Sequence, residues 1–408
     1  MQSDSSVLDR PRPLSPPRVD RPPTDPAADA EVVARRRHPR RWAALLVVLL
    51  LAAPVFYSYG TYLTKPGSAS TTERSIDWFR DHGGDSIVDR IETWWYTRSP
   101  PGSGAPNPDA FPALGGTVPA RGATERSATS TAPPAPLAPI VTGHAIAGEG
   151  LWAPAGQTVH GAPTMFTTFL RPDPHNTSIV TALVSMDQHL LRTVSVPGTI
   201  EPGHGPWAWA SGVPRRERNT LAATFNSGFR FRHIPGGYYS EGRTIDPLVD
   251  GQASLVVHRD ETVSIGEWGR DGRLSGDVVS VRQNLKLIVD AGQPVSGLMT
   301  NVDGSWGASR NQLQWTWRSG IGVDAQGRLI YAAGDHMRLG DLASVLARAG
   351  AVRAMQLDIH YGQVTFSVIQ PAGTGYGVSA AHLTGTMPKS PYRYLAADQR
   401  DFFAMFVR

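Results

Sequence analysis

The densest cluster of polar side chains in the sequence lies between Thr224 and Thr244, in the segment TFNSGFRFRHIPGGYYSEGRT. This segment follows a short apolar run, Leu221 to Phe225, which predicts a buried strand. Its candidate site residues are Asn226, Ser227, Arg230, Arg232, Glu241 and Arg243. So many polar groups on a loop at the end of a strand favour a binding or catalytic site. A Gly-rich surface hairpin with solvated arginines accounts for the same residues, and both interpretations stay open at this point.

Two further segments bring chemically useful side chains to strand ends. A predicted hairpin with its turn at residues 325–327 places Arg318 and Asp335 opposite each other at its open end, either as a cross-strand salt bridge or as part of a site. Asp358 follows an apolar run, so it is either a buried carboxylate with a partner or a site acid at a strand end. Together with Asn226, these residues predict a cleft built from three strand ends.

Several other chemistries are disfavoured. The sequence has no H-E-x-x-H, no G-x-S-x-G and no nucleotide-binding glycine motif in a suitable strand and helix setting. It has no cysteine, which excludes disulfides, cysteine-ligated zinc and thiol catalysis. Four histidines could gather in space, but their spacing is no metal signature: His233, His258, His336 and His360. We therefore expect no metal and no other cofactor.

Charge predicts no nucleic-acid partner. The formal net charge is only +4, and much of the positive excess lies in one short run, RRRHPRR, at residues 35–41. No basic stripe interleaved with aromatic residues occurs in the rest of the chain.

The residues after this basic run predict a membrane anchor. Segment 42–63 is apolar over a length that crosses a hydrocarbon core of about 30 Å. Basic residues precede it and only Lys65 follows closely, so we expect a single-pass helix with a cytoplasmic N-terminus and an extracytoplasmic remainder. A cleaved signal peptide is the alternative, but the region before the helix is long and no A-x-A site ends the apolar run. Residues 1–41, rich in proline, are expected to be a disordered cytoplasmic tail.

Three regions follow the predicted anchor. Residues 64–98 carry apolar side chains at nearly helical spacing, interrupted by Gly83 and Gly84. They predict one or two juxtamembrane amphipathic helices that lie on the membrane surface or dock against the main domain. Residues 99–149 are rich in Pro, Ser, Thr and Ala and predict a linker. Residues 150–408 are the expected compact domain.

The compact domain is expected to be an α+β, strand-rich mixed domain. Its apolar runs predict three hairpins: 178–186 with 190–196, 254–258 with 262–266, and 318–324 with 328–334. A helix capped by Asp341 and ended by Gly350 follows the third hairpin, and a strand from Val352 to Ile359 follows the helix. The resulting hairpin, helix and strand form one unit that carries two of the three predicted strand ends.

The same segments resemble a known family. TFNSGFRF, LKLIVDAGQPV, WRSGIGVDAQGRLIYAAGD and LASVLARAGAVRAMQLDIHYGQ are similar, in this order, to segments of the phosphodiester glycosidase family, and the similarity covers roughly residues 150–372. Such enzymes release a sugar from a phosphodiester, typically N-acetylglucosamine from a phosphorylated glycan. The resemblance implies a glycosidase that takes a sugar-phosphate substrate. The predicted anchor adds the expectation that this hydrolase is membrane-anchored and extracytoplasmic and that its substrate is an envelope polymer or glycolipid.

The family's motifs match this sequence in part. The residues that match its four motifs are Asn226, Gly228 and Phe229; Arg318 and Gly322; more loosely Asp335 and Arg338; and Leu357 and Asp358. The largest departure is the loop after Asp358, where Ile359, His360 and Tyr361 stand in place of glycines. A glycine loop offers its backbone N–H groups to a phosphate, and bulky side chains would block that approach.

The resemblance implies catalytic roles for three residues. The phosphomonoester that leaves is a weak base, so it needs charge stabilisation more than protonation. Arg318, assisted by Arg230 or Arg243, is expected to clamp the phosphate, and Asp335 is expected to orient Arg318. Asp358 is expected to activate water or to stabilise the oxocarbenium-like transition state.

The remaining candidates are assigned to substrate binding. Asn226 is expected to hold a sugar hydroxyl or a phosphate oxygen. The other members of the predicted binding set are Gly228, Arg230, Glu241, Arg243 and His360. The competing hypothesis is a non-catalytic envelope glycan-binding domain with a degenerate site. The altered loop after Asp358 favours that hypothesis, whereas the retained Asn, Arg and Asp positions favour an enzyme.

Overall fold

The computed structural model describes residues 39–98, 100–113, 132–143, 145–203, 205–209, 211–300, 304–307, 311–373 and 375–408. Nearly all of the expected cytoplasmic tail, up to residue 38, and the middle of the expected linker, 114–131, lie outside the described residues. Within the described part, residues 61–408 form one compact unit.

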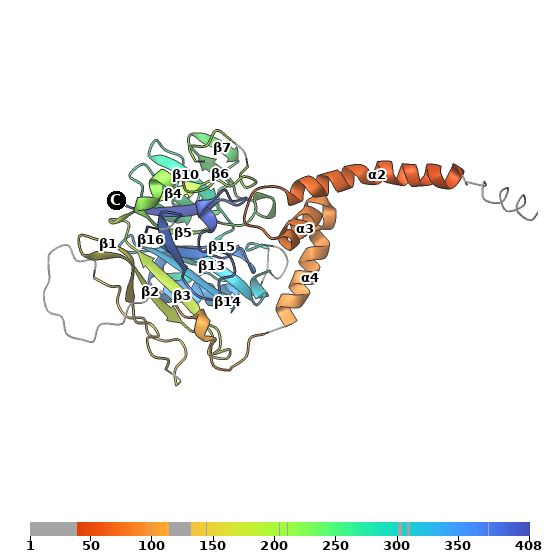
Figure 1. Ribbon diagram of the computed structural model, residues 1–408. Coiled ribbons are helices and arrows are strands. Elements are labelled where there is room, and N and C mark those ends of the chain that lie inside the picture. Colours follow the sequence, from red (N-terminus) through yellow and green to blue (C-terminus); the bar gives the residue numbers. More distant parts are fainter. Residues whose placement is uncertain are drawn as a thin grey trace, which may run out of the picture. The chain divides into compact units, whose positions relative to one another are not determined.

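Strands dominate this unit, as the sequence predicts, and they form three antiparallel sheets (Figure 1). The first sheet has eight strands in the order β1 (Ala153–Val159), β2 (Ala162–Leu170), β3 (Thr181–Met186), β14 (Leu329–Met337), β13 (Thr316–Asp324), β15 (Ala351–Ile359), β11 (Leu287–Asp290) and β12 (Gln293–Pro294). The second has five strands in the order β7 (Arg243–Asp246), β6 (Tyr238–Ser240), β10 (Val278–Gln283), β8 (Ala253–His258) and β9 (Val263–Glu267). The third also has five, in the order β17 (Val378–His382), β16 (Phe366–Pro371), β5 (Leu221–Asn226), β18 (Phe402–Val407) and β4 (Leu191–Val196).

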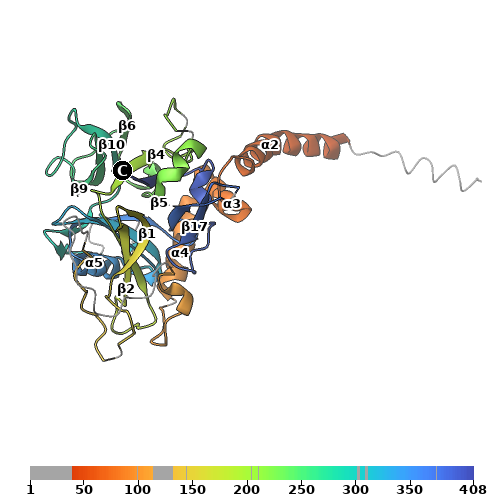
Figure 2. The same cartoon turned by 60° about the vertical axis from the view of Figure 1, so that its left-hand side comes forward.

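The expected hairpin, helix and strand unit lies in the middle of the eight-stranded sheet. Strands β13 and β14 pair antiparallel around the turn at 325–327, and β15 pairs with the other edge of β13. Helix α5 (Leu339–Arg348) connects β14 to β15 and packs on both (Figure 2). The helix begins before Asp341, which was expected to be its cap. The Asp341 carboxylate instead accepts a hydrogen bond from the Arg338 backbone N–H at 2.9 Å, so it caps from the third helical position.

One predicted hairpin is wrong. Strand β3 pairs with β2 and β14 in the eight-stranded sheet, whereas β4 pairs with β18 in the third sheet. The turn at Asp187 does form, because the backbone N–H of Leu191 donates to the Asp187 carbonyl at 2.9 Å. Both edges of β3 are already occupied, so the chain crosses to another sheet. The hairpins of β8 with β9 and of β13 with β14 are confirmed.

The core fills both faces of the eight-stranded sheet. Alternate residues of β14 point to opposite sides, so Tyr331 meets the aromatic residues of the third sheet while Ile330 packs under α5. The ring centroids of Tyr331 and Phe366 are 4.9 Å apart, and those of Phe225 and Phe403 are 5.4 Å apart. This packing holds the ends of β5, β13 and β15 in fixed relation to one another.

The N-terminal helices are α2 (Pro39–Leu63), α3 (Thr71–Phe79) and α4 (Asp85–Arg98), with a π-helical turn η1 (Arg80–Gly84) between α3 and α4. Residues Trp42–Leu63 of α2 are long and apolar enough to cross a membrane, with a mean hydropathy of 2.0. The helical kink falls at Gly83, whose φ of 94° is a left-handed value that glycine adopts readily. Short helical turns are η2 (Pro108–Ala110), η3 (Arg215–Thr220), η4 (Phe231–His233), η5 (Asn311–Leu313) and η6 (Arg393–Leu395).

Parts of the expected linker pack on the strand-rich domain. The ring of Phe111 meets that of Phe169 edge-on at 4.7 Å, and the backbone N–H of Ala113 donates to the Leu383 carbonyl at 2.9 Å. Further along, the Trp152 indole donates to the carbonyl of Ala135 at 3.1 Å. These described stretches of 99–149 therefore cover the domain surface.

Replacing Leu342 by alanine tests the packing of α5 on the eight-stranded sheet. Leu342 is fully buried, so we expect the free energy of unfolding to fall by about 3 kcal/mol through lost burial and the cavity left behind. Ser344→Ala, at an exposed position of the same helix, is the matched control and is expected to change it by less than about 0.5 kcal/mol. Equal effects of the two variants in denaturant unfolding would contradict this packing.

Candidate active site

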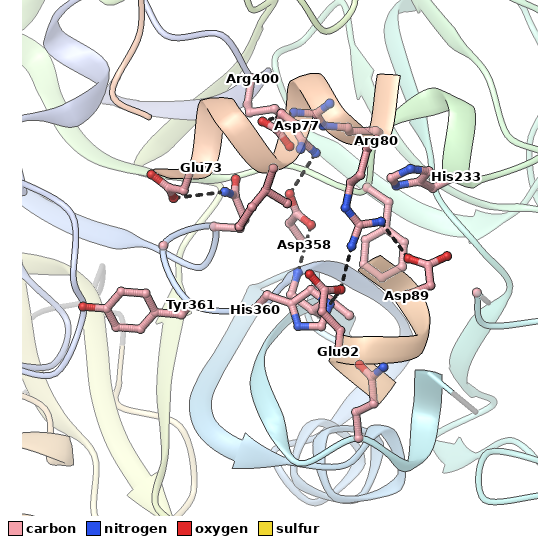
Figure 3. Close-up of a pocket in the computed structure, with 18 of the residues that line it drawn as sticks. Glu73, Asp77, Arg80, Asp89, Glu92, His233, Asp358, His360, Tyr361 and Arg400 are labelled. Carbon is pink, nitrogen blue, oxygen red and sulfur yellow. Dashed lines mark hydrogen bonds and ion pairs between the residues drawn. The ribbon is translucent and has the colours of Figure 1, made fainter. Parts of the chain in front are cut away.

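A large cavity lies between helices α3 and α4 and the strand-rich domain. Its volume is about 1110 Å³, and its walls come from α3, η1, α4, the segment after β5, the loop after β15 and the segment before β18 (Figure 3). Strand ends from two sheets therefore meet helices from a distant part of the chain. The cavity is large enough for a sugar joined to a phosphate.

Asp358 lies in the wall of this cavity, at the end of β15. Its side chain is largely buried and forms an ion pair with Arg400, with 2.8 Å between the carboxylate Oδ2 and Nη2. Its other oxygen, Oδ1, accepts the backbone N–H of Ile359 at 2.9 Å. Burial raises the pKa of Asp358 above its ordinary value, although the positive charge of Arg400 opposes that shift. A buried carboxylate with a raised pKa can exchange a proton with substrate or water.

Arg400 is a cavity residue that the sequence analysis missed. It stands in the segment DQRD, directly before the last apolar strand, FFAMFV. Besides Asp358, its guanidinium contacts the backbone carbonyl of Gly228 at 2.9 Å. A charged cluster immediately before a buried strand was the available signal, but nothing in the sequence pairs it with Asp358. The backbone carbonyl of Gly228 therefore helps to hold Arg400 in its ion pair with Asp358.

A second buried ion pair lies behind the cavity wall that carries Asp358. Arg282 of β10 and Asp401 are 2.7 Å apart, and both side chains are almost fully buried. Arg282 also donates to the backbone carbonyl of Phe229 at 2.5 Å, which fixes the segment after β5. The segment that carries Arg230 into the cavity is therefore held by charge-assisted hydrogen bonds.

The helical wall of the cavity is acidic and faces the cations of the domain. Asp77 of α3 pairs closely with Arg230, and Asp81 lies 3.7 Å from the same guanidinium. Glu73 pairs with Lys389 at 2.6 Å. The carboxylates on the helices thus pair with cations of the strand-rich domain across the cavity. The binding candidate Arg230 is therefore placed in the cavity with a carboxylate partner already bound.

Arg80 pairs with three further carboxylates of the helical wall. Its guanidinium lies 3.0 Å from Asp85, 2.6 Å from Asp89 and 2.7 Å from Glu92. Three carboxylates on α4 therefore share one arginine inside the helical element, as Figure 3 shows for Asp89 and Glu92.

His360 also lines the cavity, in a left-handed backbone conformation with a φ of 73°. Its Nδ1 lies 3.0 Å from the Thr316 hydroxyl, its Nε2 lies 3.7 Å from Glu92, and its ring stacks on Tyr96. Burial lowers the pKa of His360 to about 3, and the charges of Arg318 and Arg80 lower it further in the same direction. The imidazole is therefore neutral near pH 7.

The loop after Asp358 offers few backbone donors to a ligand. The N–H of Ile359 is bound to the Asp358 carboxylate, and the N–H of His360 donates to the carbonyl of Trp317 at 2.9 Å. Gly362 lies under Glu73, which a Cβ at this position would approach to 2.6 Å. Side-chain cations, rather than a glycine loop, are therefore the groups in this cavity that suit a phosphate.

Asn226 lies next to Asp358 but behind the cavity wall. Its Oδ1 accepts hydrogen bonds from the Tyr331 hydroxyl at 2.9 Å and the Thr365 backbone N–H at 3.1 Å. Its Nδ2 donates to the Ser319 hydroxyl at 2.9 Å, and Ser319 donates to the Asp358 backbone carbonyl at 2.8 Å. This chain of bonds ties the end of β5 to the ends of β13 and β15. The geometry favours a positioning role for Asn226 over direct contact with a substrate.

Arg318 and Asp335 also come close to this strand end without lining the cavity. Arg318 is fully buried and pairs in register with Ile359, and its guanidinium donates to the carbonyls of Met337 at 2.7 Å and Gln314 at 3.2 Å. Burial lowers the pKa of Arg318 to about 9. Asp335 is half-exposed, and its carboxylate lies 3.1 Å from the imidazole of His336.

Glu241 and Arg243 belong to the hairpin of β6 and β7 in the second sheet. Their side chains are 3.6 Å apart, and the Arg243 guanidinium stacks 4.3 Å from the ring centre of Trp207. Glu241 accepts the backbone N–H of Ala208 at 3.1 Å. The described residues that line the cavity do not include this pair. The polar segment Thr224 to Thr244 is thus divided between two places, with Arg230 and Arg232 in the cavity and Glu241 and Arg243 outside it.

No group of three or more histidine, aspartate or glutamate side chains among the described residues is arranged to hold a metal ion. On the side of the strand-rich domain, the carboxylate of Asp358 pairs with the guanidinium group of Arg400, and Arg230 lines the same cavity. Two guanidinium groups can bind a phosphate, and a neighbouring carboxylate can act on the group attached to it.

Comparison with known protein families gives a match in the part of the chain that leads to Asp358. Residues 219–358 match the phosphodiester glycosidase family. The match begins just before β5, includes β13, β14 and α5, and ends at Asp358. It confirms, for this part of the chain, the family resemblance predicted from the sequence.

Solved structures with a similar course of the chain are more distant. One is the catalytic domain of zebrafish N-acetylglucosamine-1-phosphodiester alpha-N-acetylglucosaminidase, auto-inhibited by its pro-peptide, with 15% identity, a TM-score of 0.41, and coverage of 61% of this chain and 85% of that one. Another is a hypothetical protein from Synechocystis, with 15% identity, a TM-score of 0.33, and coverage of 63% and 64%. The sequence matches no curated protein.

Replacing Asn226 by alanine tests its positioning role. The variant leaves the Tyr331 hydroxyl and the Thr365 N–H without their acceptor in a buried place, so we expect the free energy of unfolding to fall by about 3 kcal/mol. Asn219→Ala, at an exposed position before the same strand, is the matched control and is expected to change it by less than about 0.5 kcal/mol. A variant at Asn226 as stable as the control would show that these bonds do not hold the strand ends.

The stability of the protein is expected to fall as the pH falls from about 6.5 to about 4. Burial lowers the pKa of His360 to about 3, and burial with the charge of Arg232 lowers that of His233 to about 4. Over this interval the unfolded chain binds protons that the folded chain does not, so the loss is on the order of 1 kcal/mol per pH unit.

Thermal unfolding at several pH values measures this dependence. His360→Asn keeps a side chain that tolerates the left-handed backbone and removes the titrating group, so its curve is expected to be flatter between pH 6.5 and 4. His175→Asn, at an exposed histidine, is the control and is expected to follow the wild type. An equally steep curve for the His360 variant would refute the assignment.

Proposed function

We propose that this protein is a membrane-anchored, extracytoplasmic hydrolase of the phosphodiester glycosidase type. Its substrate is a sugar joined through a phosphodiester to an envelope glycan or glycolipid. The observation that carries the proposal is the ion pair of Asp358 with Arg400, 2.8 Å apart, in the wall of a large cavity next to Arg230. The family match, which ends at this aspartate, supports the same chemistry.

The proposed reaction breaks the bond between the anomeric carbon of the sugar and a phosphate oxygen. The bonding electrons pass to the phosphate, whose negative charge is held by Arg400 and Arg230. Asp358 accepts a proton from a water molecule, and the oxygen of that water forms the new bond to the anomeric carbon. The raised pKa of Asp358 suits it to take up this proton.

This assignment moves the predicted phosphate clamp from Arg318 to Arg400. Arg318 is bound to backbone carbonyl groups at 2.7 and 3.2 Å, and Arg243 stacks on Trp207 outside the cavity. In the proposal Arg318 and Asn226 act on the reaction only by holding the strand ends.

The location in the envelope follows from the first helix. Residues Trp42–Leu63 are long and apolar enough to span a bilayer, and the basic run at 35–41 precedes them. Basic residues are retained on the cytoplasmic side of a membrane, which supports an extracytoplasmic position for the domain that follows. The proposed substrate therefore belongs to the cell envelope.

A non-catalytic glycan-binding domain is the second candidate. The backbone N–H groups of Ile359 and His360 are engaged within the protein, and Arg230 is paired with Asp77. A site that had lost its activity could keep its cations and bind a sugar-phosphate without cleaving it. A measurement of sugar release distinguishes the two candidates, because only an enzyme releases the sugar.

Replacing Asp358 by asparagine tests the enzymatic proposal. The side chain keeps its size but no longer accepts a proton, so we expect kcat for sugar release from a phosphodiester-linked sugar to fall by about 10²- to 10⁴-fold. The assay follows free reducing sugar at saturating substrate with the full chain. Release at the wild-type rate would remove Asp358 from catalysis, and no release by the wild type from any phosphodiester-linked sugar would favour the binding domain.

Asp401→Asn is the matched control for this variant. Asp401 is also a buried carboxylate paired with an arginine, but it lies behind the cavity wall. Both variants break a buried ion pair and lower stability, so rates are compared per folded molecule, judged by circular dichroism. A selective loss of kcat at Asp358 is the expected result.

Substrate is expected to compete with the helical wall for Arg230. Asp77→Asn removes the carboxylate that pairs with Arg230, so we expect KM for a phosphodiester substrate to fall about tenfold, because a hydrogen bond to a charged group contributes about 1.5–3 kcal/mol. Asp89→Asn, whose partner is Arg80 on the same helical element, is the control and is expected to leave KM unchanged. An unchanged KM for the Asp77 variant would show that the carboxylate does not occupy the phosphate position.

A further inference from the structure

Helix α4 has two faces, and the part of the chain that the structure describes covers only one of them. The inner face carries Asp85, Asp89 and Glu92 toward Arg80, and Thr93 accepts a hydrogen bond from Gln314 at 3.1 Å. The outer face carries four large apolar side chains at positions that share one side of a helix. Their exposed fractions are Ile87 51%, Ile91 59%, Trp94 53% and Trp95 61%.

These four side chains form an apolar stripe, and an exposed stripe of this kind is expected to contact a partner other than water. Four neighbouring side chains of this size form a contiguous patch rather than a scattered exposure, and such patches mark interaction surfaces. Two of the four are tryptophans, whose rings concentrate at the boundary between lipid acyl chains and head groups.

The charges around the stripe favour an anionic lipid surface. The exposed arginines on α4 are Arg90 and Arg98, and the Arg98 guanidinium lies 5.2 Å from the ring centre of Trp94. The acidic side chains of the helix are turned inward and held by Arg80. The outer face is therefore apolar and cationic, which is the pattern of helices that lie in a bilayer interface.

The course of the chain brings this helix near a membrane. The candidate span ends at Leu63 and α3 begins at Thr71, only a few residues later, with α4 following after a single kinked turn. If the proposed anchor spans the bilayer, the short connection keeps α4 within reach of its outer surface. This step rests on the anchor proposed above, whereas the apolar stripe itself does not.

We propose that α4 lies on the outer surface of the membrane, with Ile87, Ile91, Trp94 and Trp95 inserted between lipid head groups and acyl chains. The partner is the phospholipid surface itself, and the contact is made by the face of α4 opposite to the cavity. An α-helix is about 10 Å thick, so the cavity lies about that distance from the bilayer surface. The sugar-phosphate head group of a lipid-linked substrate would then reach Asp358 while its lipid tail stays in the membrane.

Single labelled cysteines test the docking directly, because the native chain contains no cysteine. Ile91→Cys in the full chain carries a nitrobenzoxadiazole dye, and the chain is reconstituted in vesicles of phosphatidylcholine and phosphatidylglycerol. Ala325→Cys, in the exposed turn between β13 and β14, is the matched control. We expect the dye at position 91 to be quenched by lipids with a shallow nitroxide, to be shielded from aqueous iodide, and to emit at shorter wavelength than the dye at 325.

Two results would overturn the proposal. Iodide quenching at position 91 equal to that at position 325 shows that the stripe faces water. Shielding from both quenchers, together with a disulfide between two copies of the unlabelled Ile91→Cys chain, shows that a second copy of the chain covers the stripe. A further variant combines Trp95→Asp with the dye at position 87. We expect the dye to lose its shielding from iodide. The unfolding temperature is expected to stay unchanged, because the side chain of Trp95 is exposed.

Extraction with alkaline carbonate separates this proposal from the proposed anchor. A chain that is released by carbonate but is shielded at position 91 beforehand docks without a span, so the anchor fails and the docking stands. A chain that resists extraction but is open to iodide at position 91 keeps the anchor and contradicts the docking. Sugar release in the same vesicles reports on the enzymatic proposal independently of both.

Discussion

The ion pair between Asp358 and Arg400 is the interaction on which the account depends. It joins the end of β15 in the eight-stranded sheet to the segment that leads into β18 of the third sheet, across 2.8 Å. A charge buried in this way is tolerated only with its partner present, so each residue requires the other to be in place. The hydrogen bond of Asn226 to Ser319 joins the third sheet to the eight-stranded sheet beside this pair, and the pair of Arg282 with Asp401 ties the second sheet to the segment that carries Arg400.

The cations of the cavity also explain why α3 packs where it does. A cavity that contains Arg230, Arg400 and Lys389 attracts carboxylates, and α3 supplies Asp77 and Glu73. The helical element is therefore complementary in charge to the cavity and resembles an anionic ligand on that side. Its opposite side is apolar and cationic, so one short element can face both an anion-binding cavity and a lipid surface.

Local patterns in the sequence were sufficient to predict the unit of hairpin, helix and strand in the middle of the eight-stranded sheet. The turn at 325–327 and the apolar face of α5 depend on neighbours in the chain, and both are found where they were predicted. The pairing of β3 with β14 could not be predicted in this way, because it depends on residues far apart in sequence. The same reason explains the mistaken hairpin of β3 with β4, whose turn exists although the strands part after it.

The meeting of three strand ends was predicted from the sequence, but the contacts of their side chains were not. The strand ends that carry Asn226, Arg318 and Asp358 do meet, because the residues around them are apolar and the core forces the strands together. The direction of each side chain was not available from spacing, so the burial of Arg318 against backbone carbonyl groups was missed. Arg400 and Asp77 lie far from Asp358 and Arg230 in sequence, and only the folded chain brings each pair together.

The most direct test of the central claim is a crystal structure of the protein with a sugar 1-phosphate bound. The account predicts phosphate oxygens within about 3 Å of the guanidinium groups of Arg230 and Arg400, with Asp77 displaced and the anomeric carbon turned toward Asp358. A ligand bound on the hairpin of Glu241 and Arg243, or with its phosphate out of reach of Arg400, would contradict it.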